Sequence, residues 1–212
     1  MGKTLALYGK EKADIAYFLA KSLASNDFLV AIIDNSYSKD LFDSINQKES
    51  DENFIEKENI IYLKDALVDE DFTNKFDFVL FYQGSNETVV KSDYSFVITD
   101  YTKPLISDVK RLSDDIKDKS YFIFRDKVTG KITEANLSRE LDICKDKILG
   151  YLPLNLKDEV TYQGFTYTGR GRLKETSSDM KYAVMTLVSI VTGDDLKTVR
   201  KYYRKAKRNK RF

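Results

Sequence analysis

Apolar residues in this chain occur in two patterns, short continuous runs and longer segments in which an apolar residue recurs every third or fourth position. The short runs predict strands that are buried on both faces, because neither face of such a run is polar. The predicted strands cover residues 5–8, 29–33, 60–63, 76–82, 94–99, 121–124 and 148–151. Residues 5–8 and 76–82 are expected to be neighbouring central strands.

Most segments between these apolar runs have apolar residues at the spacing of an amphipathic helix. The predicted helices cover residues 11–25, 107–116, 136–145 and 177–191, and a basic helix is expected at 194–206. Strands that alternate with helices predict an α/β fold, a mostly parallel sheet with helices on both faces. We expect one domain over residues 1–192, followed by a basic C-terminal helix or tail at 193–212.

The amino-acid composition limits the catalytic mechanisms that this protein could use. The chain has 212 residues, a length that suits a single domain, and it contains no histidine. Serine and cysteine triads, zinc hydrolases and most general-base schemes near neutral pH rely on imidazole, so these are excluded. The single cysteine, Cys144, cannot form an internal disulfide and is expected to face the core. We predict no catalytic residue and no metal site.

Charge is distributed unevenly along the chain. Residues 197–212 contain nine Lys/Arg and no acid, whereas the rest of the chain has 26 basic and 34 acidic residues, a net charge of −8. The acidic stretch 65–71 is expected to be a solvated loop or helix face. Because the sequence has neither an apolar run of membrane-spanning length nor a signal-peptide core, we expect a cytoplasmic protein.

The turn after the first predicted strand has the most informative sequence. Gly9-Lys10-Glu11-Lys12 joins an apolar strand to a helix, as a phosphate-binding loop would, but Ala13 follows the second lysine. A working P-loop has about eight residues here and a Ser/Thr hydroxyl for Mg²⁺ directly after the lysine. The turn is therefore either a residual anion site at a helix N-terminus or a tight turn with solvated lysines.

The order of these segments resembles the ParA/MinD group of deviant-Walker ATPases, which includes plasmid partition, septum-placement and pilus-localisation proteins. Tyr8-Gly9-Lys10 is similar to the family's loop opening, whose lysine reaches the nucleotide of a dimer partner, and Lys12 stands where the phosphate lysine is expected. The second strand ends at Asp34, as in the family. However, Tyr82-Gln83-Gly84 stands where the resemblance implies the Walker B aspartate.

Two further segments extend the resemblance toward the base-binding region. Gly150-Tyr151-Leu152-Pro153 is similar to the family's Gly-x-Ile-Pro segment, and Arg125 occupies the place of an adenine-reading Asn. The resemblance implies a vestigial nucleotide or anion site made of Gly9, Lys10, Lys12, Asp34, Arg125 and Pro153.

The glycine loop, the Mg²⁺ hydroxyl and the Walker B carboxylate are all missing from this otherwise similar frame. We therefore predict a degenerate, non-hydrolysing ParA/MinD-like protein that acts as a positioning, scaffold or partner-binding subunit, as a homodimer or with a protein partner. Processes such as plasmid partition, conjugation or pilus and cell-pole placement fit this role. No cofactor is required, and residual ATP or ADP binding stays open. One alternative is an active but unusual ATPase that relies on Lys10 and Lys12. Another is a nucleic-acid-binding accessory protein.

The basic tail supports this last alternative. Its expected polyanion-binding residues are Lys197, Arg200, Lys201, Arg204, Lys205, Lys207 and Arg208. Attachment to an anionic membrane is less favoured, since Leu196 and Val199 offer little apolar bulk for insertion. A docked structural helix, or contact with an acidic protein, also stays open.

Overall fold

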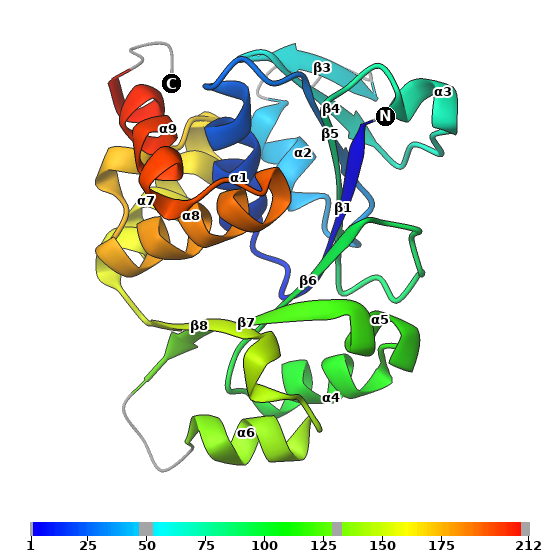
Figure 1. Ribbon diagram of the computed structural model, residues 1–212, viewed down its shortest axis with the longest axis vertical. Coiled ribbons are helices and arrows are strands. Elements are labelled where there is room, and N and C mark those ends of the chain that lie inside the picture. Colours follow the sequence, from blue (N-terminus) through cyan, green and yellow to red (C-terminus); the bar gives the residue numbers. More distant parts are fainter. Residues whose placement is uncertain (1, 47–52, 129–132, 209–212) are drawn as a thin grey trace.

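A computed structural model describes residues 2–46, 53–128 and 133–208 and shows one sheet covered by helices (Figure 1). Within these residues the strand order is β3-β4-β2-β5-β1-β6-β7-β8. All neighbouring strands are parallel except β3 and β4. The strands are β1 (Lys3–Gly9), β2 (Val30–Asp34), β3 (Phe54–Lys57), β4 (Ile60–Lys64), β5 (Phe78–Gly84), β6 (Tyr94–Thr99), β7 (Ser120–Lys127) and β8 (Ile148–Pro153). The predicted α/β fold is confirmed.

The central strands β1 and β5 pair in parallel, with Lys3 opposite Phe78, as the sequence predicted. Side chains of β1 alternate between two cores: Leu5 and Leu7 join the larger core, and Ala6 joins the smaller one on the other face. Both faces of the strand are therefore covered, which explains its continuous apolar sequence.

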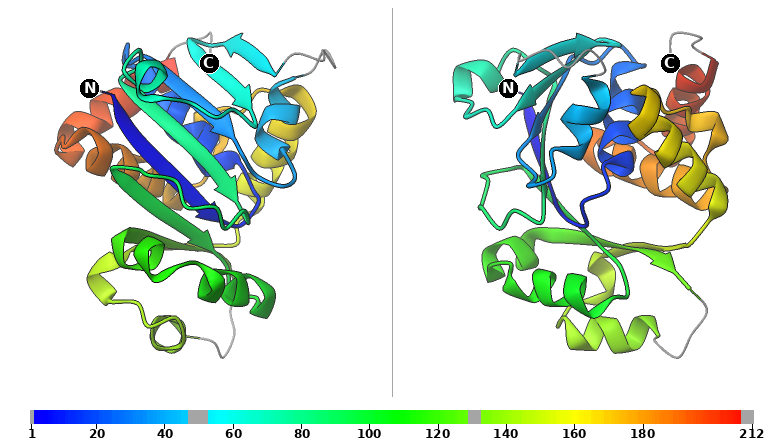
Figure 2. Two further views of the ribbon diagram at one scale, coloured as in Figure 1. Left: turned by 90° about the vertical axis from the view of Figure 1, so that its right-hand side faces the viewer. Right: turned by 180° about the vertical axis from the view of Figure 1, so that it is seen from behind.

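The helices form a layer on each side of the sheet (Figures 1 and 2). The larger layer contains α1 (Asp14–Ala24), α2 (Asp40–Ile45), α7 (Leu156–Thr168), α8 (Ser178–Thr192) and α9 (Leu196–Arg208). The opposite layer contains α4 (Lys103–Arg111), α5 (Asp114–Lys119) and α6 (Glu134–Glu140). The short helix α3 (Glu70–Thr73) lies on the far side of the sheet from α7 in all three views.

Several local predictions were wrong. The expected helix 107–116 is two helices, because the chain leaves helical geometry at Leu112 and Ser113 before α5 begins. Cys144 is exposed, since it precedes the short 3₁₀ helix Lys145–Lys147 on the surface. The acidic stretch 65–71 is exposed at all four of its acidic positions, as expected.

Candidate functional site

The turn after β1 is short and requires glycine. Only residues 10–13 join Gly9 to α1. Gly9 has a φ of +104°, and a Cβ added there would lie 2.0 Å from the carbonyl oxygen of Ile98. The backbone N–H of Lys10 donates to that same oxygen at 2.7 Å. The turn is therefore fixed against the end of β6, and a side chain at Gly9 has no space.

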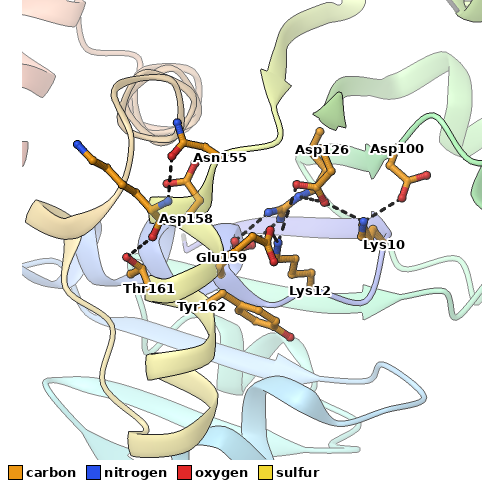
Figure 3. A network of polar contacts seen from close by, with 12 residues as sticks. Lys10, Lys12, Asp100, Asp126, Asn155, Asp158, Glu159, Thr161 and Tyr162 are labelled. Carbon is orange, nitrogen blue, oxygen red and sulfur yellow. Dashed lines mark hydrogen bonds and ion pairs between the residues drawn. The ribbon is translucent and has the colours of Figure 1, made fainter. Parts of the chain in front are cut away.

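Lys10 lies between two carboxylates, one at the end of β6 and one in β7. Its Nζ is 2.8 Å from Asp100 Oδ2 and 2.8 Å from Asp126 Oδ2 (Figure 3). Burial alone lowers the pKa of Lys10, but the hydrogen bonds to both acids outweigh it and raise the pKa. The pKa values of Asp100 and Asp126 are lowered despite burial, because nearby cations stabilise their charged forms. All three groups are charged at neutral pH.

Lys12 is paired in a similar way and is almost fully buried, with 6% of its surface exposed. Its Nζ forms an ion pair with Glu159 of α7 and lies 3.9 Å from Asp126 Oδ1 (Figure 3). The ammonium group also lies 5.2 Å from the centre of the Tyr162 ring, which suits a cation–π contact. The lysine that the resemblance assigns to phosphate thus contacts acidic and aromatic groups of its own chain.

Helix α7 places Glu159 and Tyr162 beside the turn because its first turn is anchored at two residues, Asn155 and Asp158. The Asn155 side chain caps the helix by accepting from the N–H of Lys157 at 3.0 Å. The carboxylate of Asp158 accepts from the N–H and the hydroxyl of Ser177, each at 2.6 Å. These bonds hold α7 against the start of α8 and leave Glu159 facing the lysine.

Arg125 points at Asp14 in the first turn of α1. Two guanidinium nitrogens lie 2.6 and 2.9 Å from the two carboxylate oxygens, and each residue is 1% exposed. Arg125 Nε also donates to Asp126 Oδ2 at 3.2 Å. Burial disfavours the charged guanidinium, but the charge of Asp14 outweighs it and the pKa of Arg125 is raised. This bidentate pair joins β7 to α1 in the interior.

Acidic side chains also accept from backbone N–H groups around the turn. Asp40 Oδ2 accepts from the N–H of Ala13 at 3.0 Å and from the Tyr162 hydroxyl at 2.9 Å. Glu11 accepts from the N–H groups of Tyr37 and Ser38 in the loop after β2, at 3.3 and 3.2 Å. A backbone donor at the start of α1, of the kind that binds phosphate in a P-loop, is therefore bound to a carboxylate here.

Asp34 and Pro153 lie apart from this ion network. Asp34 is buried and accepts from the N–H and hydroxyl of Ser36 and from the N–H of Phe42, so it orders the chain between β2 and α2. Burial raises the pKa of Asp34 to about 6. Pro153 is exposed at the end of β8. Of the residues predicted from sequence, the structure brings together Gly9, Lys10, Lys12 and Arg125.

The charges of the network nearly cancel. Three cations, Lys10, Lys12 and Arg125, face four carboxylates. The four acids are Asp14, Asp100, Asp126 and Glu159. The net charge is −1, so the network offers a polyphosphate no excess of positive charge. In the described part of the chain, no group of three or more His, Cys, Asp or Glu side chains is arranged to hold a metal ion.

Sequence reasoning missed Asp100, Asp126 and Glu159. A signal for the first two was present, because Asp100 directly follows one apolar strand, Asp126 lies near the end of the next, and parallel strands end at the same edge of a sheet. No comparable signal identified Glu159, since its helix was not predicted.

The basic tail forms helix α9, which packs on the domain through its apolar side. Val199 is 1% exposed, and the Tyr203 hydroxyl donates to the Leu173 carbonyl oxygen at 3.0 Å. Lys205 pairs with Asp27 at 2.5 Å. The other cations with described side chains are exposed: Lys197, Arg200, Lys201 and Arg204. The side chains of Lys207 and Arg208 lie outside the described ones. No described helix has the length and apolar character needed to cross a bilayer.

Comparison with known proteins places the fold. No protein-family model and no curated protein matches the chain. MinD in the MinC:MinD complex of Aquifex aeolicus matches with a TM-score of 0.69 at 14% identity, covering 92% of this chain and 97% of that one. A ParA family ATPase from Chlorobium tepidum TLS matches with a TM-score of 0.61 at 12% identity, covering 86% and 96%. A putative plasmid partition protein from Borrelia burgdorferi, bound to AMPPNP, matches with a TM-score of 0.62 at 12% identity, covering 91% and 100%. The chain therefore has the P-loop NTPase-like fold of the ParA/MinD ATPases.

Proposed function

We propose that this chain is a non-hydrolysing ParA/MinD-like protein that acts as a positioning, scaffold or partner-binding subunit. One observation supports this most directly: the lysines of the shortened turn are bound by carboxylates of the same chain. A nucleotide that entered would have to displace Asp126 and Glu159 from these lysines, which would leave Glu159 without its ion pair and Asp126 with Arg125 alone. Separating hydrogen-bonded charge pairs in a part-buried site costs free energy, which opposes nucleotide binding.

The region after β5 supports the same proposal. Gln83 and Gly84 end this strand where a catalytic carboxylate would be needed, and the nearby Glu11 carboxylate is already bound to backbone N–H groups, those of Tyr37, Ser38 and Ser85. Asp14 occupies the second position after Lys12 and is committed to Arg125. Phosphoryl transfer depends on positioning and charge stabilisation, and the chain's own groups here provide neither.

Calorimetry with ATP and with ADP, each with and without Mg²⁺, tests the proposal together with an assay of phosphate release. We expect no binding and no turnover above background for the natural chain. Mg²⁺-dependent ATP binding that disappears in Lys12→Ala would establish the alternative, an unusual ATPase.

A double variant and a matched control test whether the carboxylates are what keeps anions out of the site. Glu159→Gln combined with Asp126→Asn removes two carboxylates and leaves Lys12 without a charged partner in the described network. We expect this variant to gain measurable binding of inorganic pyrophosphate. The matched control is Glu140→Gln, whose acid pairs with Lys110 on the surface and should leave binding unchanged. No gain in the double variant would show that the carboxylates are not what excludes the anion.

The partner-binding part of the proposal draws on the fold and on the MinC:MinD complex, in which a protein of this fold binds another protein. We propose a homodimer or a protein partner for this chain as well. Affinity for ATP is not needed for such a role. Size-exclusion chromatography with light scattering, with and without ATP, measures the oligomeric state and its independence of nucleotide.

Nucleic-acid binding through α9 is the second candidate, and the position of the helix favours it over membrane attachment. The apolar side of α9 is packed on the domain, whereas four cations of the opposite side are exposed. A helix that inserts into a membrane needs its apolar side free. Mobility-shift titration against DNA and RNA, beside sedimentation with anionic vesicles at two salt concentrations, separates the two functions.

A further inference from the structure

Helix α7 borders a groove that the chain itself does not fill. The groove has a volume of about 940 Å³ and lies between α7 and residues 170–175. Leu156, Val160, Gly164 and Thr168 follow one another at four-residue spacing along α7 and line one wall. Leu156 is 77% exposed and Val160 is 58% exposed. A contiguous apolar surface of this kind marks an interaction site more often than chance.

Gly164 is an independent sign that something approaches this wall closely. It lies inside α7, where glycine costs about 0.5–1 kcal/mol relative to alanine. Nothing in the chain requires it: its φ is not in the left-handed region, and a Cβ added there would have no neighbour within 4 Å. The groove is therefore open directly above the backbone of α7 at this position, and the absence of a side chain at Gly164 makes it wider still.

The polar rim of the groove is mainly basic. Lys157, Arg170 and Arg172 line it together with a single acid, Glu175, which pairs with Arg172 at 3.3 Å. Lys157 and Arg170 have no ion pair among the described residues. An occupant that combines an apolar side chain with acidic neighbours would complement this rim.

The chain presents such a segment on its opposite side. Residues 65–71, Asp-Ala-Leu-Val-Asp-Glu-Asp, expose Leu67 completely, at 103%. Ala66 and Val68 pack on the sheet, so the segment is held in place with Leu67 directed outward. Asp65 pairs with Lys39 and Asp69 caps α3, but Glu70 and Asp71 are exposed without an ion pair in the described residues. We call segment 65–71, with its outward-facing Leu67, the knob. Because the knob is already ordered, it loses little conformational freedom on docking.

We propose that the groove of α7 binds segment 65–71 of a second copy of this chain, with Leu67 over Gly164 and the acids toward Lys157 and Arg170. Helix α7 and the segment that leads into α3 lie on opposite sides of the sheet in all three views (Figures 1 and 2), so the segment of one copy cannot reach the groove of the same copy. A pair joined by one such contact therefore keeps a free knob on the copy whose groove is filled and a free groove on the other copy. This head-to-tail contact builds open chains or closed rings rather than a two-fold dimer.

Sedimentation equilibrium of the full chain over a wide range of concentration tests the inference. We expect assembly that continues beyond the dimer, with the weak affinity typical of small interfaces, and that weakens with salt. Gly164→Leu fills the groove with a good helix former, and Leu67→Asp removes the knob. Each should lower the association constant about tenfold or more. Val89→Asp, at another exposed apolar position, is the matched control and should assemble as the natural chain does.

Mixing the two blocked variants gives the sharpest result. Leu67→Asp keeps its groove and Gly164→Leu keeps its knob, so an equimolar mixture should form one-to-one complexes that grow no further. A natural chain that stays monomeric, or closes at a dimer unaffected by both variants, would overturn the inference. So would a mixture that forms no complex. Lys10 and Lys12 do not line the groove, so any of these failures leaves the proposal for the nucleotide site untouched.

Discussion

The buried pair between Arg125 and Asp14 should be among the most sensitive points of the fold. Both residues are 1% exposed and two hydrogen bonds of 2.6 and 2.9 Å join them. Asp14→Asn removes the negative charge and leaves the guanidinium in the interior. Loss of one partner of a buried pair costs about 3–5 kcal/mol. Because Asp126 still accepts from Arg125 at 3.2 Å, we expect about 3 kcal/mol.

Urea unfolding followed by circular dichroism measures this loss. A domain of this size is stable by about 5–15 kcal/mol, so the midpoint should fall clearly while the slope m stays constant. The melting temperature should fall by about 6–12 °C. The double variant Asp14→Leu with Arg125→Met replaces both charges by apolar groups and should recover most of the stability.

The matched control is the surface pair between Lys117 and Asp114, with nitrogen and oxygen 2.8 Å apart. Asp114 is 89% exposed at its side chain, so Asp114→Asn should leave the unfolding midpoint unchanged. Equal midpoints for Asp14→Asn and Asp114→Asn would refute the reasoning. So would a double variant as unstable as the sum of its two single changes, because it would show that the two charges are not coupled.

Three further outcomes are expected. Gly9→Ala should destabilise the fold by more than about 1 kcal/mol in chemical unfolding, because of its positive φ and the contact with Ile98, and an unchanged midpoint would contradict the geometry of the turn. Asp34 has a pKa raised to about 6, so the folded state retains its proton longer than the unfolded state and this contribution to stability is lost as pH rises from about 4 to about 6. Asp34→Asn should flatten that part of a pH–stability curve, and an identical slope would refute the shift. Replacing three exposed cations of α9 by Gln should reduce the salt slope of DNA binding by about three in log–log terms, and an unaltered slope would exclude α9 from the contact. The replacements are Arg200→Gln, Lys201→Gln and Arg204→Gln.

The sequence predicted the sheet better than its surroundings. Apolar runs without alternation identified β1 and β5 as central strands, because only strands covered on both faces have this pattern. The four-residue strand β3 was missed, since Phe54–Lys57 is too short for a periodicity to show. Helix α7 was missed for another reason: its apolar residues lie on several sides, facing the core at Phe165 and solvent at Val160.

The candidate site was predicted only in its basic half. A glycine and two lysines after an apolar strand are a local signal, readable over four residues. The carboxylates that bind those lysines come from positions 90 to 147 residues away, so only the folded topology brings them together. Arg125 illustrates the difficulty, because the sequence suggested its place in the fold but not that it faces Asp14.

The pairing of the turn's lysines has a consequence for how the protein responds to the energy state of the cell. A fold completed by a bound ligand gains stability with ligand concentration, about 2.7 kcal/mol at a hundred times the dissociation constant. In this chain the anions that neutralise Lys10 and Lys12 are part of the polypeptide and are present at a fixed effective concentration. If the proposed function holds, its stability stays constant as nucleotide levels rise and fall, and the same surface is presented in growing and in starved cells.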